Sequence, residues 1–465
     1  MTPAIDPTPR RKRLTWTGAI ARVRARVLTA ERNIRSKLTW SRLYRASSYA
    51  RSALWIVPFV AMFIVMAVGP LIRVIDRALG WQLLNLGLHG AEALYQTVIT
   101  LTLSFLVFTF GSLLVAIQIA GGQLTPRIIA TTLLRDNVVR YSVGLFVFAL
   151  MFSVTSLNRL EDRVLQIGVF ICACLGILCL VTFLFLIDYA ARLLRPGSIL
   201  ATVSREGLAV IASVYPETVG DGGDEVISLG ALPQAPRRVV VHAGNSQVVL
   251  AVDLEALMRR ARRTRGTIEF VPHVGDFVAV GEPLFILYNG ATTIDDRKLR
   301  DAVALGPERT MEQDPLFSLR ILVDIALKAL SPAINDPTTG VLAIDQIQRL
   351  LRSVGQRRLH GDVLTDGLGQ PRVVYRTPNW EDFVHLSCTE IRANGAHNMQ
   401  VARRLRALLD NLITSLPRHR CRILEEERDR LDAVIQTHFP LPADLALARI
   451  ADSQGLGAST RTPAS

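Results

Sequence analysis

The polar residues best suited to chemistry form two short segments in the second half of the chain. Together these segments contain Arg309, Gln313, Asp314, Ser331, Asn335 and Asp336. Carboxylate, amide and hydroxyl oxygens suit a cation or a small polar ligand. They do not form a nucleophile and its general base, because no histidine lies between His273 and His360. The sequence therefore predicts a ligand or ion site without a catalytic residue, provided that the two segments meet, which the sequence leaves open.

The second segment also has a purely structural explanation. Pro332 ends one helix, Asp336 is suited to cap the next helix, and Pro337 suits its first position, where a missing N–H costs nothing. A corner between two helices would alone account for most of this segment. The helix that joins the two segments is expected at Leu316 to Leu330. It carries a charged residue at every fourth position from Arg320, which indicates a partly buried soluble helix and not a further membrane span.

Four long stretches between residues 53 and 187 contain no charged residue. A hydrocarbon core of roughly 30 Å needs about 20 apolar residues in a helix, and a helix satisfies its own backbone hydrogen bonds in lipid. We therefore predict a four-helix transmembrane bundle. Its spans are expected at about residues 53–72, 95–120, 140–158 and 164–187.

The net charge of +13 is concentrated at the N-terminus. Residues 1–51 contain thirteen Lys and Arg against Asp6 and Glu31, which leaves only +2 for the remaining residues. Such a balance excludes a strong phosphate-binding field, so nucleic acid is not an expected partner. The basic arm directly precedes a span, and the loop with Arg127 and Arg135 is basic too. These charges predict anionic lipid headgroups as partners of the arm, an inner-membrane location and cytoplasmic termini.

The second and fourth stretches have distinct compositions. In the second, the polar residues Thr109, Ser112, Gln118 and Gln123 indicate either hydrogen bonds between packed helices or one wall of a polar pathway. In the fourth, the small residues Gly168, Cys172 and Gly176 recur four apart and predict close helix packing, within the chain or between copies of it. We therefore expect a homo-oligomer in the lipid bilayer, with an undefined number of copies.

The cysteines favour a reducing compartment. Three of the five fall inside the fourth stretch, and none forms a CxxC pair or a histidine-rich zinc cluster. The sequence leaves the cofactor and any metal unknown.

The chain divides into five predicted regions that make up a membrane protein with a cytoplasmic α+β domain. A basic amphipathic arm (1–51) precedes the transmembrane domain (52–190). A small α+β or barrel-like module (198–292), a helical domain (295–440) and a C-terminal helix with a disordered tail (441–465) follow.

The chain resembles a family of predicted bacterial membrane proteins, domain-of-unknown-function family twenty-two fifty-four. The resemblance rests on Gly121 to Arg127, on Val274 to Val278, on Arg309-Thr310 with Gln313-Asp314, and on Ala329 to Pro332 with Asn335 to Pro337. It covers roughly residues 50–440 and implies an integral membrane protein with a large soluble domain. It implies no activity.

Three hypotheses follow from these patterns. The first is a non-enzymatic channel or transporter whose cytoplasmic domain senses or gates. The second is a membrane-anchored scaffold or assembly factor that acts through its helical half. The third is an enzyme that uses Asp314 and Asp336 around a divalent cation.

Overall fold

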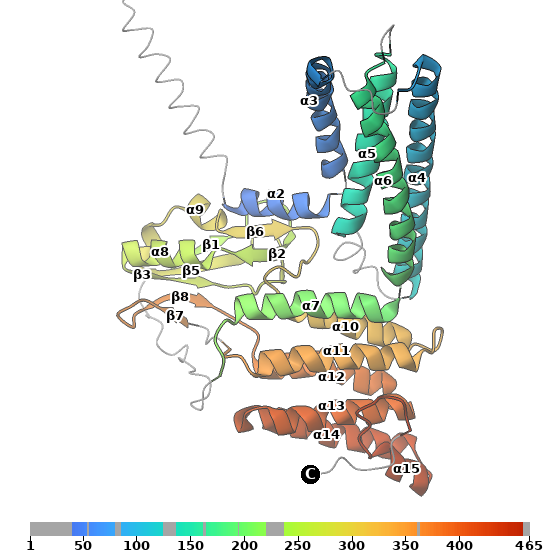
Figure 1. The fold of residues 1–465 in the computed structure, drawn as a ribbon. Coiled ribbons are helices and arrows are strands. Elements are labelled where there is room, and N and C mark those ends of the chain that lie inside the picture. The colour runs from blue at the N-terminus through green and yellow to red at the C-terminus, as the bar shows by residue number, and fades with distance from the viewer. Residues whose placement is uncertain are drawn as a thin grey trace, which may run out of the picture.

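A bundle of four long helices packs on a layered second half of the chain (Figure 1). We call this second half, from Pro196 onward, the soluble half. The structure is a computed structural model. It describes residues 40–53, 55–79, 85–123, 136–160, 164–193, 195–219, 237–359 and 363–458. Most of the predicted basic arm therefore lies outside the described residues.

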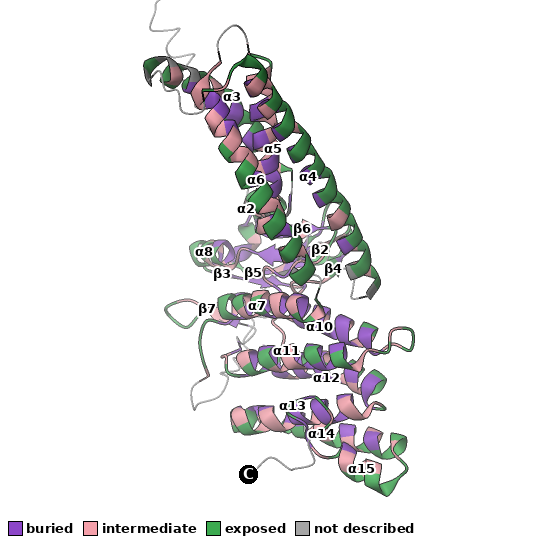
Figure 2. Cartoon of the chain, turned by 45° about the vertical axis from the view of Figure 1, so that its right-hand side comes forward, coloured by how far each residue is buried: buried purple, intermediate pink, exposed green. Residues whose placement is uncertain are grey.

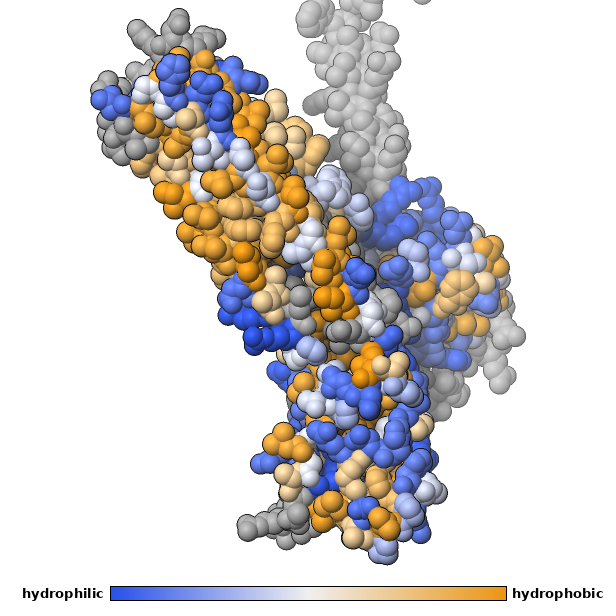
Figure 3. Space-filling view, turned by 90° about the vertical axis from the view of Figure 1, so that its right-hand side faces the viewer, coloured by the Kyte–Doolittle hydropathy of each residue, from blue (hydrophilic) through white to orange (hydrophobic). Residues whose placement is uncertain are grey.

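The bundle consists of α3 (Ile56–Leu79), α4 (Leu88–Gln123), α5 (Asn137–Leu157) and α6 (Gln166–Leu193). These helices contain the four predicted stretches. On the face shown in Figure 3, apolar side chains gather over the bundle, whereas hydrophilic and apolar residues are mixed over the soluble half. Because this apolar surface would be costly in water, it indicates a membrane-embedded segment.

Five of the described helices are long and apolar enough to cross a membrane: α3 to α6, and α7 (Pro196–Val214). The sequence predicted four. In the structure α7 runs across the lower end of the bundle (Figure 1). It packs on α10 (Pro315–Ala329) and α11 (Pro337–Gly355), and its residues Ile199, Leu200 and Val203 belong to the core of the soluble half.

The small-residue face of α6 packs inside the bundle. A Cβ at Gly176 would lie 2.9 Å from Val98 Cγ2 of α4, so a side chain there would require the Val98 side chain or the helices to shift. Cys172 Sγ lies 3.2 Å from Ser153 Oγ of α5. The close packing predicted for this face thus joins helices of one chain.

Two small sheets form the β module beside the bundle. One has the order β1-β5-β3-β8-β7 and the other the order β4-β2-β6. The strands are β1 (Arg237–Val241), β2 (Gln247–Val252), β3 (Gly266–Phe270), β4 (Phe277–Val278), β5 (Pro283–Asn289), β6 (Val303–Gly306), β7 (Val363–Thr365) and β8 (Pro371–Tyr375). Its helices are α8 (Leu254–Thr264) and α9 (Asp296–Arg300). Since β6, β7 and β8 lie within the predicted helical domain (295–440), where a strand was expected only at Arg372 to Tyr375, strands from both predicted soluble domains share these sheets.

The helical part of the soluble half is stacked in layers below α7 (Figure 1). Besides α10 and α11 it contains α12 (Trp380–Gly395), α13 (Met399–Ser415), α14 (Arg418–His438) and α15 (Pro442–Ala448). One continuous apolar core joins these helices to α7, and Ile117 of α4 packs against the same core. The second membrane helix therefore reaches directly into the soluble half.

A short helix, α2 (Trp40–Ser52), connects the N-terminal arm to the bundle. Trp40 and Tyr44 of α2 pack against Leu250, Ala251 and Ala304 of the β module. The β module is therefore held next to the start of α3.

Candidate functional site

The first predicted segment forms a tight cluster at the N-terminus of α10. Asp314 is 3% exposed, and its Oδ1 accepts the N–H of Phe317 at 3.1 Å as the cap of the helix. Arg309 donates from Nε to Asp314 Oδ2 at 2.8 Å. The guanidinium also lies over the Phe317 ring, 5.8 Å from its centre. The buried carboxylate is thus satisfied by its helix and by one arginine.

This cluster fastens the β module to the helical part. A Cβ at Gly275 would lie 2.0 Å from Arg309 Nη2, and Gly275 has a φ of +96°, which favours glycine. The guanidinium therefore lies directly on the backbone of the loop before β4. Gln313 Oε1 accepts the N–H of Val252 in β2 at 3.0 Å. All three residues predicted in this segment serve the junction.

Burial dominates the electrostatics of the cluster. It raises the pKa of the Asp314 carboxyl above its ordinary value, and the charge and hydrogen bond of Arg309 oppose the rise. Burial, followed by the charge of Asp314, raises the pKa of Tyr375 to about 12, so its phenol stays protonated at neutral pH. Arg309 is therefore the group that compensates the Asp314 charge.

The second predicted segment closes the turn between α10 and α11. Ser331 Oγ donates to Lys328 O at 2.6 Å, and Asp336 Oδ1 accepts the N–H of Thr339 at 3.1 Å. Asp336 Oδ2 also accepts the Thr339 hydroxyl at 2.5 Å. Asn335 has a φ of +49°, a left-handed conformation that asparagine tolerates. Ser331 and Asp336 thus use their polar groups to build the corner.

The two segments do not meet. Asp314 caps the start of α10, whereas Ser331 follows its end, and 15 helical residues separate them. At 1.5 Å per residue this distance is about 22 Å. A single cation cannot be shared by Asp314 and Asp336, so the hypothesis of an enzyme built around these two carboxylates loses its basis. Among the described residues there is no group of three or more His, Cys, Asp or Glu that could hold a metal.

The predicted pathway residues of α4 do not share one face. Thr109 is 3% exposed and faces the bundle, whereas Gln118 is exposed on the opposite side of the helix. Ser112 is half-buried, and its hydroxyl donates to Thr109 O at 3.0 Å. The side chain of Gln123 lies outside the described part of the structure.

The exposed face of α4 instead presents a row of small and polar residues, which we call the α4 stripe and which is interrupted by the exposed apolar residues Val107, Phe108, Leu114 and Val115. It consists of Ala93, Thr97, Thr100, Ser104, Gly111, Gln118 and Gly122. Their spacing of three, four or seven positions places them on one side of a helix. Figure 2 shows this outward side of α4 as exposed along most of its length. The sequence contained this row, but only the structure shows which way it faces.

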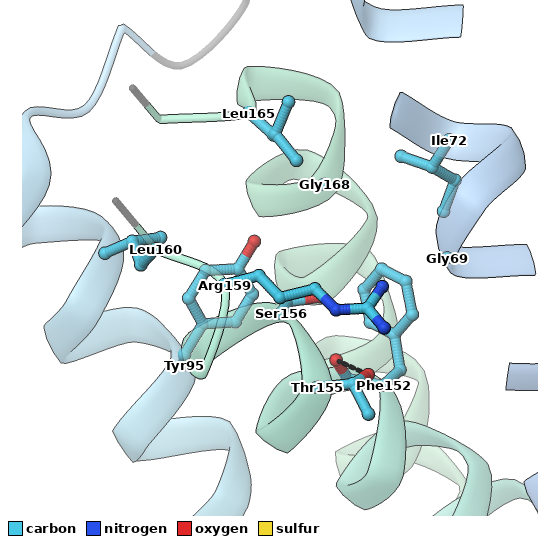
Figure 4. Close-up of a pocket in the computed structure, with 10 residues that line it drawn as sticks. All are labelled: Gly69, Ile72, Tyr95, Phe152, Thr155, Ser156, Arg159, Leu160, Leu165 and Gly168. Atoms are coloured by element: carbon cyan, nitrogen blue, oxygen red, sulfur yellow. Dashed lines mark hydrogen bonds between the residues drawn. The ribbon is translucent and has the colours of Figure 1, made fainter. Parts of the chain in front are cut away.

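A small pocket with a mixed polar and apolar lining lies between the four helices at the end of the bundle remote from the soluble half (Figure 4). Its volume of about 30 Å³ is enough to hold a water. Tyr95 and Ser156 contribute to its lining, and the Arg159 side chain extends past the Tyr95 ring toward Phe152. A Cβ on Gly69 of α3 would lie 3.4 Å from Arg159 Nη1. Because its lining comes from four helices, no local motif could have predicted this pocket.

Comparison with known proteins places these features in a family. The family described as "Predicted membrane protein (DUF2254)" matches residues 51–411. The chain belongs to this family. Uncharacterised proteins of Mycobacterium bovis and Mycobacterium tuberculosis are each 25% identical to it over 378 residues, which covers 78% of this chain and 72% of each relative. No solved structure matches the chain.

The DUF2254 assignment confirms the family indicated by the sequence and identifies a predicted membrane protein of unknown function. Two of the four sequence motifs that carried the resemblance are in contact, because the Arg309 guanidinium lies on the backbone at Gly275. The phrase from Ala329 to Pro337 lies at the other end of α10. In this DUF2254 protein the motifs near Arg309 and Asp336 thus form two separate structural corners.

Proposed function

We propose that the protein is a multi-pass protein of the bacterial inner membrane that assembles into an oligomer through the α4 stripe. The seam between copies provides a pathway for ions or small solutes, and the soluble half, which lies in the cytoplasm, gates it. The α4 stripe is the observation that carries this proposal.

Four helices cross the membrane under this proposal. α7 is excluded because Ile199, Leu200 and Val203 are already buried in the soluble core, and because α7 lies across the bundle (Figure 1). A helix cannot lie along the inner surface of a membrane and also span it. The apolar character of α7 is explained by the core that it covers.

The orientation follows from the charges at the inner end of the bundle. Arg42 and Arg45 are exposed on α2, immediately before α3, and Arg140 and Arg192 lie near the same end. Positive charge collects on the cytoplasmic side of membrane proteins. We therefore place the soluble half and both termini in the cytoplasm, with α2 and the basic arm on anionic lipid headgroups.

A lone α4 would expose its stripe to lipid, where polar groups gain nothing. The hydroxyls of Thr97, Thr100 and Ser104 bond back to carbonyls four residues earlier, at 2.7, 2.9 and 2.8 Å. These side chains are thus short and locally satisfied, which lets another helix approach closely. No atom lies within 4 Å of an added Cβ at Gly111 or Gly122, so the space next to the stripe is open in one chain.

The position of the α4 stripe across the membrane fits an interface between copies that ends in a polar opening on the cytoplasmic side. Counting about 20 residues inward from Ala93 reaches Ser112, the inner limit of the hydrocarbon. Gln118 then lies at the cytoplasmic end, next to Ile117, which contacts the soluble core. A movement of that core therefore acts on the mouth directly.

The test is to add bulk to the stripe. In Gly111→Leu the oligomer of the full chain in lipid nanodiscs is expected to dissociate, as measured by mass photometry, and solute flux into liposomes should be lost. The matched control is Cys174→Leu, which adds bulk at an exposed position of α6. An oligomer that survives Gly111→Leu unchanged, or a monomeric wild-type chain, would refute the role of the stripe.

Flux separates a pathway from a scaffold. Gln118→Leu removes the polar group at the inner mouth and is expected to reduce flux while the oligomer persists. If the oligomer forms but liposomes stay tight to every ion and small solute tried, the pathway is wrong, and the membrane-anchored scaffold becomes the better explanation.

A further inference from the structure

A cleft of about 470 Å³ lies where the β module, α2, α7 and the β7-β8 hairpin meet. Its lining includes Trp40 from α2, Ser213 from α7, Asp253 and Glu255 around the start of α8, and Tyr375 from β8. This volume is large enough for a small organic molecule. No residue of the cleft was singled out by sequence except Gln313, which lies at its edge with the motif cluster.

The chemistry of the lining is acidic and aromatic. Two carboxylates line the cleft together with the rings of Trp40 and Tyr375, and the lining residues that the structure describes, from Trp40 onward, include no lysine or arginine. Both rings are only partly buried. Aromatic faces and carboxylates are the groups that recognise ammonium ions. Because the Tyr375 phenol is protonated at neutral pH, its ring is neutral and does not repel the carboxylates of Asp253 and Glu255.

Two arginines, Arg259 and Arg260, interact with these carboxylates but do not line the cleft. Arg259 pairs with Glu255 at 3.2 Å, but both side chains are mostly exposed, and such pairs are weak. Burial lowers the pKa of Arg260, and the charge of Asp253 opposes that shift. Asp253 Oδ1 caps α8 through the N–H of Ala256 at 2.9 Å, which leaves Oδ2 for a ligand.

We propose that this cleft binds a small organic cation, a primary or quaternary amine, between the Trp40 and Tyr375 rings and the carboxylates of Asp253 and Glu255. The amine connects elements that lead directly into the membrane, since α2 precedes α3 and α7 follows α6. Its effect on gating rests on the proposed function, whereas its binding does not.

The experiment measures amine binding by isothermal titration calorimetry with the full chain in nanodiscs of zwitterionic lipid. The probes are choline and putrescine, and potassium chloride controls for ionic strength. Saturable binding of one amine per chain is expected. Trp40→Ala should weaken it by about tenfold or more, and Trp40→Phe, which keeps a ring, by less.

Asp253→Asn removes the charge but keeps a helix cap, because asparagine caps as well as aspartate. It should also weaken binding by about tenfold. The matched control is Asp295→Asn, the same change at the cap of α9 outside the cleft, which should bind like the wild type. Glu255→Gln, at an exposed position, provides a second charge variant with no effect on folding.

Three outcomes are decisive. No saturable heat with either amine overturns the site, and so does wild-type affinity in both Asp253→Asn and Glu255→Gln. If the wild type binds the amine and these variants do not, the site is established. If the bound amine then leaves the liposome flux of the wild type unchanged, the result counts against the gating role of the soluble half.

Discussion

Removing Arg309 should destabilise the junction between the β module and the helical part. Arg309→Met keeps an unbranched side chain against Gly275 and Phe317 but leaves the Asp314 carboxylate buried without its partner. Breaking a fully buried ion pair costs roughly 3–5 kcal/mol. Arg309 is 37% exposed while Asp314 is 3% exposed, so water screens part of the lost charge, and we expect about 2–3 kcal/mol.

The assay is the melting temperature of the full chain in detergent, followed by circular dichroism. A loss of 2–3 kcal/mol corresponds to roughly 4–12 °C for a domain of this size. Arg309→Met/Asp314→Asn should recover part of the loss, because asparagine still caps α10 and carries no charge. Arg422→Met is the control. It breaks the exposed pair with Glu426, at 2.9 Å, and should change the melting temperature little.

The loss of stability caused by Arg309→Met should become smaller as the pH falls. Burial already raises the pKa of Asp314 in the folded chain, and loss of Arg309 raises it further. A carboxyl with a raised folded pKa is penalised above that pKa, and the penalty fades as pH falls through it toward about 4, the ordinary value for aspartate. The gap between Arg309→Met and wild type should therefore narrow on acidification. A constant gap, or a double variant no better than Arg309→Met, would refute this reasoning.

Three further predictions concern other contacts. Gly275→Ala should lower the melting temperature by more than Gly281→Ala, because both positions have positive φ but only the first would press a Cβ onto Arg309; equal losses would contradict this. Gly176→Leu should reduce the yield of folded monomer, since Val98 fills the space, whereas Gly111→Leu should leave the monomer folded, as size-exclusion profiles would show. Arg320 holds the pKa of Glu390 below its ordinary value, so the stability that this ion pair contributes exists above about pH 4.3 and is lost on acidification. Glu390→Gln should therefore flatten the acid side of the plot of melting temperature against pH. An unchanged slope would disprove the pairing.

The membrane half was predictable because hydrophobicity along a helix is a local property. Each uncharged stretch became one helix of the bundle. α7 belongs to the predicted α+β module (198–292) and not to a predicted span, although its length and apolarity would also allow it to cross a membrane. Sequence alone cannot distinguish a helix buried by protein from one buried by lipid when the residues are equally apolar.

The candidate site was predictable only in its parts. The cap at Asp336 follows from local rules, and so does the length of the helix that separates it from Asp314, whereas the cap at Asp314 was shown only by the structure. By contrast, the contact of Gly275 with Arg309 depends on how the β module folds. The parallel pairing of Ile268 with Val373 joins residues more than a hundred positions apart, and no local pattern indicates it.

The continuous α4 gives the protein a sensitivity to the thickness of its bilayer. Because Ile117 packs against the core of the soluble half, a shift of α4 along the membrane normal would also have to move that core. In a thinner bilayer α4 must then tilt, as any helix does when its apolar stretch is longer than the hydrocarbon core is thick. That tilt swings the core beneath it. Lipid composition thereby becomes a mechanical input to the helical core next to the bundle.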